Sequence, residues 1–222
     1  MAYDLEEQEQ LASLQAFWNK YGNILMGVAI VAMLSYSGYT WYKYDQSKQA
    51  VGASVLFSNL TTAAEAKDNA LVQRTAADIQ AKFKGSAYAQ MSALAAAKSA
   101  FDAGDLKVAK AQLQWVVSNG SDEYQSIAKL RLAGVLLDEK AYDEALKILA
   151  APFAKEFAGA VADRRGDVLV AQNKIAEART AYLAALQAMD KTVPGRGLVE
   201  MKLEAIGGTV PKADVAAPKA AA

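Results

Sequence analysis

The sequence contains no cysteine and no histidine among its 222 residues, and only four prolines. Without cysteine there are no disulfides, thiolate nucleophiles or cysteine-ligated zinc, and without histidine there are no histidine-based triads or metal centres. The commonest general acid and base of enzymes is therefore missing. Lys and Arg together number 24, as do Asp and Glu, so no overall charge excess indicates a nucleic-acid partner. We expect no cofactor, no metal and no enzymatic activity.

Charged residues are also absent between Lys20 and Lys43. The uncharged stretch, residues 21–42, is 22 residues long, and at about 1.5 Å per residue such a helix spans a hydrocarbon core of about 30 Å. Aromatic rings, which prefer the headgroup level, lie at both ends: Phe17, Trp18, Tyr21, Tyr39, Trp41, Tyr42 and Tyr44. The preceding segment is acidic and no A-x-A-like site follows directly. We therefore interpret 21–42 as an uncleaved signal-anchor rather than a cleaved signal peptide or a buried core helix.

The charges beside this stretch leave its orientation open. Lys20 lies on one side and Lys43 and Lys48 on the other, and a difference of one charge does not decide topology. Gly27 and Gly38 are eleven residues apart, so they share one helix face and are candidates for a contact with another transmembrane helix.

The remainder of the chain is rich in Ala, Leu, Lys, Glu and Gln and has no convincing period-2 segment. This composition favours helices. Turn residues separate the predicted helices, with breaks at Gly85, Gly104, Asn119-Gly120, Lys140, Asn173 and Pro194-Gly195. The predicted helices span 45–66, 69–84, 87–103, 105–118, 122–139, 141–157, 158–172, 174–190 and 196–206.

The same pattern of a tight turn followed by a second helix occurs three times. Ala109, Ala145 and Ala178 occupy its equivalent positions, 36 and 33 residues apart. A period near 34 with paired helices is the signature of tetratricopeptide repeats. We therefore predict an all-α fold in which a single N-terminal transmembrane helix is followed by a tetratricopeptide-like helical-repeat solenoid. An irregular helical bundle is the alternative.

Four segments follow from these patterns. They are an acidic N-terminal segment at 1–20, the transmembrane helix at 21–42, the repeat domain at 43–206 and a disordered Ala/Pro/Lys tail at 207–222.

A repeat array of this kind presents a concave groove lined by the first helix of each pair. A groove with apolar side chains and a few charges binds a peptide or a partner helix. The predicted inward-facing residues are Met91, Leu94, Lys98, Phe101, Leu130, Leu137, Asp163 and Asp167. Core packing is the alternative for the apolar members, and helix capping explains the carboxylate pairs elsewhere in the chain.

Several blocks resemble a known family. An acidic N-terminus precedes Phe17-Trp18 and Tyr21-Gly22, the anchor ends in Trp41-Tyr42-Lys43, and Val-Ala-Asp-Arg-Arg-Gly-Asp occupies 161–167. Over about residues 1–206 the chain is similar to the bacterial ancillary SecYEG translocon subunit family. The resemblance implies an inner-membrane protein with a cytoplasmic N-terminus and a periplasmic repeat domain. It also implies association with the SecYEG translocon, a membrane-anchored periplasmic chaperone of the prolyl-isomerase type and secreted client polypeptides.

The function expected from this resemblance is that of a non-catalytic adaptor that assists the handover of secreted chains to periplasmic chaperones. Two alternatives remain open on the sequence. One is a regulatory module that sequesters a stress-signalling protein, and the other is a scaffold for cell-envelope assembly.

Overall fold

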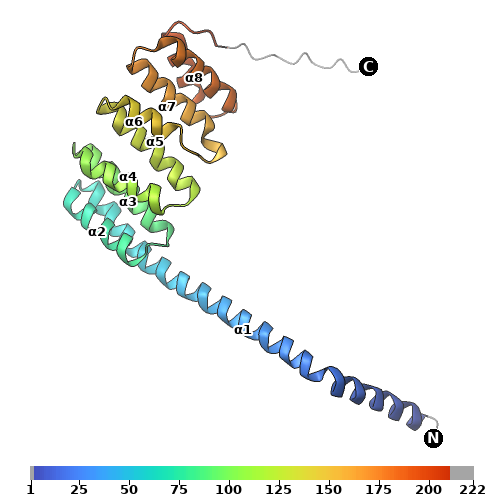
Figure 1. Cartoon of the computed structure of the whole chain (residues 1–222). Coiled ribbons are helices and arrows are strands. Elements are labelled where there is room, and N and C mark those ends of the chain that lie inside the picture. Colours follow the sequence, from blue (N-terminus) through green and yellow to red (C-terminus); the bar gives the residue numbers. More distant parts are fainter. Residues whose placement is uncertain (1–2, 211–222) are drawn as a thin grey trace, which may run out of the picture. The chain divides into compact units, whose positions relative to one another are not determined.

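The computed structural model describes residues 3–210. Residues 1–2 and 211–222 lie outside it, so most of the tail predicted at 207–222 falls on residues that the structure does not describe. The described residues form α-helices joined by short turns, with one short 3-10 helix (Figure 1). The described part of the chain divides into two units, with the boundary between Gly52 and Ala53.

The first helix, α1 (Tyr3–Glu65), differs from the prediction. The sequence analysis separated an anchor at 21–42 from a first repeat helix at 45–66, whereas the structure has one uninterrupted helix. The residues between these two segments include neither proline nor glycine, so nothing in this stretch interrupts the backbone hydrogen bonds of the helix. The change from apolar to charged residues at Lys43 is therefore a change of surface along α1 and not the end of a helix.

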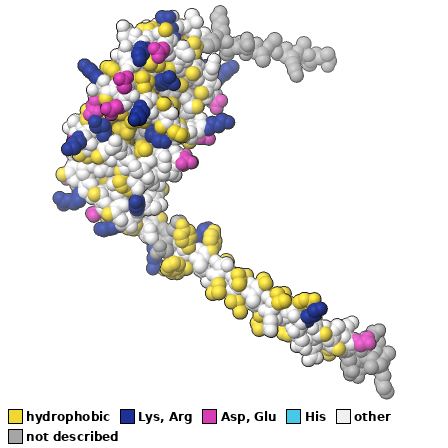
Figure 2. Space-filling view, viewed as in Figure 1, with side chains coloured by type: hydrophobic (Ala, Val, Ile, Leu, Met, Phe, Trp, Pro, Cys, Tyr) yellow, Lys and Arg dark blue, Asp and Glu magenta, His cyan; other side chains and the backbone are white. Residues whose placement is uncertain are grey.

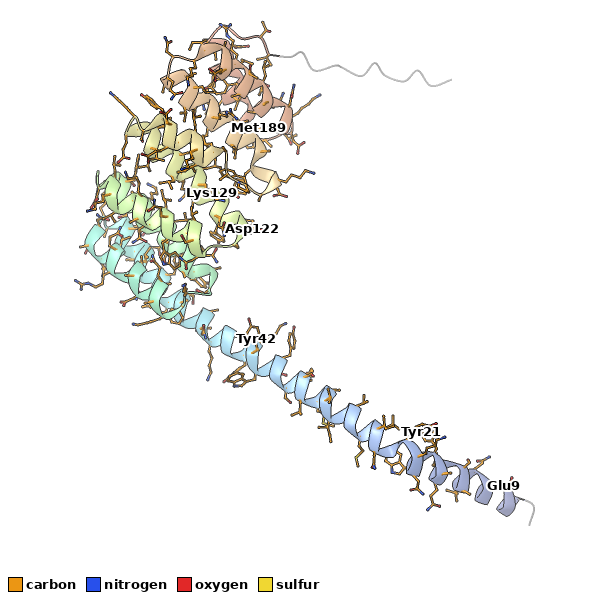
Figure 3. All side chains as sticks on the ribbon, in the orientation of Figure 1. Glu9, Tyr21, Tyr42, Asp122, Lys129 and Met189 are labelled. Carbon is orange, nitrogen blue, oxygen red and sulfur yellow. The ribbon has the colours of Figure 1, made fainter. Side chains whose placement is uncertain are left out.

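The uncharged part of α1 carries its apolar side chains on the outside (Figure 2). Among the described residues α1 is the one helix long and apolar enough to cross a membrane, by length and composition. Tyr21 and Tyr42, at its two ends, both project from the helix (Figure 3). The Ser35 hydroxyl donates a hydrogen bond of 2.8 Å to the Val31 carbonyl of the same helix. A hydrogen bond within the helix suits a lipid environment, because no water is present there to bond a polar side chain.

The second unit contains the end of α1 and the repeat helices, which pack in sequence order (Figure 1). The predicted ends of the repeat helices agree with the structure to within two residues, except at 141–157. The helices are α2 (Asn69–Lys82), α3 (Ala87–Asp102), α4 (Leu106–Asn119), α5 (Asp122–Asp138), α6 (Tyr142–Leu149), α7 (Ala158–Ala171), α8 (Ile175–Ala188) and α9 (Arg196–Ala205).

Three of the predicted breaks within the repeats are residues with positive φ. Gly104, Lys140 and Asn173 follow α3, α5 and α7 with φ values of 80°, 61° and 61°. A residue in this left-handed region ends a helix and turns the chain back. Asp68 and Asp105 then cap the N-termini of α2 and α4 through their side chains.

The alanines that define the repeat are completely buried. Ala109, Ala145 and Ala178 are each 0 % exposed. Such small side chains let two helices approach closely, and the helix surfaces on either side can then pack. The repeat period in the sequence thus corresponds to one position in the core, and the tetratricopeptide-like architecture is confirmed.

The helix predicted at 141–157 is wrong beyond its first half. Helix α6 ends at Leu149, and a short 3-10 helix occupies Lys155–Phe157. The chain between them contains Pro152, which cannot continue an α-helix. Two side chains of α5 hold this connection: the Ser126 hydroxyl accepts a 3.0 Å hydrogen bond from the Ala154 N–H, and the Lys129 ammonium donates one of 2.8 Å to the Pro152 carbonyl.

Candidate functional site

A groove of about 410 Å³ lies among α3, α5 and α7, the first helices of three successive pairs. Phe101 of α3 is its most exposed large apolar side chain, with 40 % of its surface accessible. Buried Leu113 of α4 and Val135 of α5 add apolar surface beside it. The remaining lining residues are Ala97, Lys98, Asp102, Arg131, Gly134, Asp138 and Arg164. The groove thus combines an exposed aromatic ring with charged side chains.

The charges around this groove are only partly paired within the protein. Lys98 forms an ion pair with Asp102 on its own helix, and Arg164 lies 3.6 Å from Asp167. Neither Arg131 nor Asp138 has an ion-pair partner among the side chains that the structure describes. An unpaired guanidinium beside an exposed aromatic ring suits recognition of a carboxylate on a partner.

Two of the predicted groove residues, Lys98 and Phe101, line this groove together. The other apolar candidates lie elsewhere. Leu94 is 7 % exposed and belongs to a cluster of buried residues from α3 to α7 that also contains Leu113 and Leu136, the central core cluster. Met91 is half-buried, and Leu130 and Leu137 are half-buried residues that pack against the same cluster.

Asp163 and Asp167, the acidic candidates, lie in an ion-pair network. The Lys202 ammonium, from α9, donates to Asp163 Oδ1 at 2.8 Å and to Oδ2 at 3.1 Å, and it lies 2.8 Å from Asp167 Oδ1. The Tyr182 hydroxyl donates a 2.9 Å hydrogen bond to Asp167 Oδ1. These contacts join α7 to α8 and α9. Both carboxylates are therefore engaged inside the array.

The network changes the proton affinities of its members. Burial raises the pKa of Asp163, against the opposing effect of its hydrogen bond from Lys202. Burial alone would lower the pKa of Lys202, but its hydrogen bonds to Asp163 and Asp167 outweigh this and raise it. Burial, together with the charge of Asp167, raises the pKa of Tyr182. Lys202 is thus charged and Tyr182 neutral at physiological pH.

The prediction missed the α5 face that lines the groove. Arg131, Gly134 and Asp138 follow an i, i+3, i+7 spacing and line the groove. Arg131 comes directly after the predicted groove residue Leu130, and Asp138 comes directly after Leu137. One residue rotates a helix face by about 100°. The charged residues Arg131 and Asp138 could have indicated this face from the sequence. The predicted residues Leu130 and Leu137 pack against the core instead.

The two glycines proposed for a transmembrane contact lie in the uncharged part of α1. A Cβ atom placed on Gly27 or Gly38 would meet nothing within 4 Å. The contact with another transmembrane helix stays a prediction. Across the residues that the structure describes, no group of three or more His, Cys, Asp or Glu side chains could hold a metal ion.

Comparison with known proteins identifies the family. A family model described as a tetratricopeptide repeat-like domain matches residues 15–208. The chain is 36% identical over 208 residues to the ancillary SecYEG translocon subunit of Neisseria gonorrhoeae, covering 93% of this chain and 100% of that relative. The chain belongs to the ancillary SecYEG translocon subunit family.

Two further relatives carry the same name and extend the similarity. The protein from Escherichia coli is 29% identical over 89% of this chain and 95% of its own length. The protein from Haemophilus influenzae is 27% identical over 84% of this chain and 92% of its own length. No solved structure matches the chain. The family resemblance inferred from the sequence blocks is thus confirmed.

Proposed function

We propose that this protein is a non-catalytic, single-pass adaptor of the SecYEG translocon in the bacterial inner membrane. The observation that carries the proposal is the similarity over the whole length of the Neisseria gonorrhoeae ancillary SecYEG translocon subunit. The uncharged stretch of α1 supports it, because a helix of this length and composition can cross a membrane.

The proposed topology places the N-terminus in the cytoplasm and the repeat domain, residues 43–206, in the periplasm. It rests on the family resemblance, since the charges beside the uncharged stretch are too evenly divided to set the orientation. A domain of this length translocates largely regardless of its charge. In this orientation the groove at Phe101 faces the compartment into which secreted chains emerge.

The groove at Phe101 is the proposed binding site of the repeat domain. Exposed aromatic and arginine side chains in a concave surface are the residues that contribute most to protein binding. Phe101 and Arg131 provide both, and their neighbours Ala97 and Gly134 leave room for a partner. The proposed partners are the membrane-anchored periplasmic chaperone of the prolyl-isomerase type and segments of secreted client chains.

Anchoring strengthens these contacts. A domain held at the membrane by α1 meets other membrane-bound proteins at a high effective concentration, so individually weak contacts are sufficient. Transient binding suits handover, because a client polypeptide has to leave the adaptor. The face that contains Gly27 and Gly38 is the proposed contact with a helix of the translocon.

Site-specific photo-crosslinking in membranes tests this function. A photoreactive amino acid is placed at single positions within residues 21–42 and at Phe101, and the adducts are identified by mass spectrometry. Adducts to translocon subunits from the anchor, together with adducts to a periplasmic chaperone or a secreted chain from Phe101, support the adaptor. Adducts confined to cytoplasmic regulators reverse the topology and favour the signalling alternative.

A pair of charge variants sharpens the test. Arg131→Glu changes an exposed groove residue, and Arg74→Glu changes an exposed arginine on α2 that lies outside the groove lining. We expect Arg131→Glu to reduce the Phe101 adducts about tenfold or more and Arg74→Glu to leave them unchanged. Equal adduct yields in both variants, with unchanged circular dichroism, contradict the assignment of this groove.

A further inference from the structure

A second groove, of about 540 Å³, lies between α7 and α8 beside the end of α6. Its lining is mostly apolar and comes from all three helices: Leu149 ends α6, Val161 and Leu169 belong to α7, and Ala181 and Ala184 belong to α8. None of these residues lines the groove at Phe101. We call this second surface the α7–α8 groove.

The groove lies where α6 is short. From the equivalent buried alanines, α4 continues from Ala109 to Asn119 and α8 from Ala178 to Ala188, ten residues in each case. Helix α6 continues only four residues beyond Ala145, to Leu149. The second helix of this pair therefore lacks the turns that the neighbouring pairs have.

The missing turns are core-forming in the other repeats. Seven residues beyond the equivalent alanine, α4 has Val116 and α8 has Ala185, and both are 0 % exposed. The corresponding residue after α6 is Pro152, which is exposed and outside any helix. On this side Ala158 of α7 and Ala184 of α8 are exposed and Val161 of α7 is half-buried. These residues lack the cover that a full-length α6 would provide.

The connection after α6 is held on a different helix. The hydroxyl of Ser126, a residue that is 1 % exposed, accepts a hydrogen bond from the Ala154 N–H. The Lys129 ammonium donates a hydrogen bond to the Pro152 carbonyl and lies 5.4 Å from the centre of the Phe153 ring. Phe153 packs against the central core cluster. Because these contacts tie the connection to α5, it is not a loose segment that can fold back over the α7–α8 groove.

The rim of the groove carries one charge of each sign. Arg165 lies on the α7 side and Glu177 on the α8 side, and both are exposed. Neither forms an ion pair with any side chain that the structure describes. An apolar floor between two unpaired charges of opposite sign matches an amphipathic helix that has an acidic residue on one edge and a basic residue on the other.

We propose that the α7–α8 groove binds an amphipathic helix of a partner protein, which takes the place of the missing turns of α6. Helix-in-groove binding of this kind uses apolar residues spaced three and four apart. The partner helix directs these residues at Ala158, Val161 and Ala184, with its acidic edge toward Arg165 and its basic edge toward Glu177. This surface is separate from the groove at Phe101, so the protein holds two partners, or two parts of one partner, at once.

The test uses the full chain in membranes, with a photoreactive amino acid at Thr180 or Ala184 in the groove. The matched control places it at Ala77, an exposed alanine of α2. We expect the two groove probes to react with one segment of a partner, at residues three or four apart. The control probe gives at least about tenfold fewer adducts to that segment.

Variants then test the mode of binding. Ala184→Trp fills the groove and lowers the adduct yield from Thr180 about tenfold, whereas Ala77→Trp leaves it unchanged. Arg165→Glu lowers the yield as well, and a matching acid-to-lysine change in the partner segment restores it. Arg165 is exposed, so its variant keeps the test valid if Ala184→Trp does not fold. Arg131→Glu does not change the Thr180 adducts, which separates this site from the groove at Phe101.

Four results overturn the proposal. They are adducts at alternate residues of an extended segment, adducts to a second copy of this chain, yields no higher than from Ala77, and yields that Ala184→Trp leaves unchanged although it folds.

Discussion

The uncharged stretch of α1 and the repeat helices are made of similar residues that experience opposite surroundings. Leu34 in α1 is 68 % exposed, whereas Leu113 in α4 is 2 % exposed. Apolar side chains face outward in one region and inward in the other. The first arrangement suits lipid and the second suits water, because in each the apolar surface is kept from water.

The two regions therefore tolerate change differently. In the uncharged stretch the requirement is apolar composition over a sufficient length, and no particular neighbour within the chain is needed. In the repeats Gly166 meets a specific partner. A Cβ atom at Gly166 would lie 2.3 Å from the Tyr182 ring, whereas one at Gly27 would meet nothing within 4 Å.

The same truncation in both regions should have the largest difference in effect. We expect Leu113→Ala to lower the free energy of unfolding by about 2–5 kcal/mol, because it leaves a cavity in the core. Leu34→Ala should cost less than about 1 kcal/mol of membrane insertion. Thermal unfolding followed by circular dichroism measures the first, and membrane extraction measures the second. Similar costs in both would remove the distinction between the regions.

A charged substitution at an exposed position should be more harmful in the uncharged stretch of α1 than in the repeat unit. Val31 in α1 is 64 % exposed and Val55 in the repeat unit is 58 % exposed. Val31→Arg should cost about 2.5–3.5 kcal/mol of membrane insertion, whereas Val55→Arg should change stability by no more than about 0.5 kcal/mol. The fraction of protein resistant to carbonate extraction checks Val31→Arg, and thermal unfolding followed by circular dichroism checks Val55→Arg. If Val31→Arg stays fully integrated, the uncharged stretch does not cross the membrane.

The glycines make a finer comparison. Gly166→Ala should destabilise the repeat unit by about 1–3 kcal/mol, since α7 has to move away from the Tyr182 ring. Gly27→Ala should leave the helix intact, because alanine has the higher helix propensity. Both are measured by thermal unfolding of the full chain in detergent. A Gly166→Ala variant as stable as the parent would show that the close approach at Tyr182 is not required.

The ion pairs distinguish buried from exposed charges within the repeats. Lys202→Met removes a partner of Asp163 and Asp167, and we expect a loss of about 2 kcal/mol. Lys98→Met breaks an ion pair whose side chains are 70% and 57% exposed, and it should have almost no effect. Denaturant unfolding compares the two. Equal losses would mean that the network between α7 and α9 contributes no more than a surface pair.

The smallest expected effect is on the alkaline side of the stability profile. The folded state raises the pKa of Lys202 above 10.5 and that of Tyr182 above 10.0. The unfolded chain therefore releases these protons first, and the free energy of unfolding falls as the pH rises above about 10. The stability that Lys202 contributes is complete below that pH. The Lys202→Met variant should show a shallower decline, and an unchanged decline would contradict the assignment.

Local patterns predicted most of the fold. The repeat period placed Ala109, Ala145 and Ala178 in the core, and turn residues such as Gly104 and Asn173 placed the helix ends. These features depend on backbone conformation and on hydrophobic spacing over a few residues. The predicted length of α6 was wrong although the sequence contains Pro152, because the spacing of apolar residues continues past this proline.

The candidate site was predictable only in part. Lys98 and Phe101 were predicted because they lie on the first helix of a pair, and both line the groove. On α5 the prediction chose Leu130 and Leu137, whereas the next residues along the helix, Arg131 and Asp138, line the groove. Large apolar residues such as Leu130 and Leu137 suggest a binding surface as readily as they suggest a core. Only the packing of the neighbouring helices distinguishes the two.

The uncharged stretch, the helical fold and the repeat are predictable from the sequence, since each depends on residues close together in the chain. Which side chains meet depends on the packing of helices that are far apart in the sequence. Lys202 and Asp163 are 39 residues apart, and the α7–α8 groove exists because α6 stops while its neighbours continue. Such contacts depend on how helices pack across the array, and that packing is a property of many side chains together.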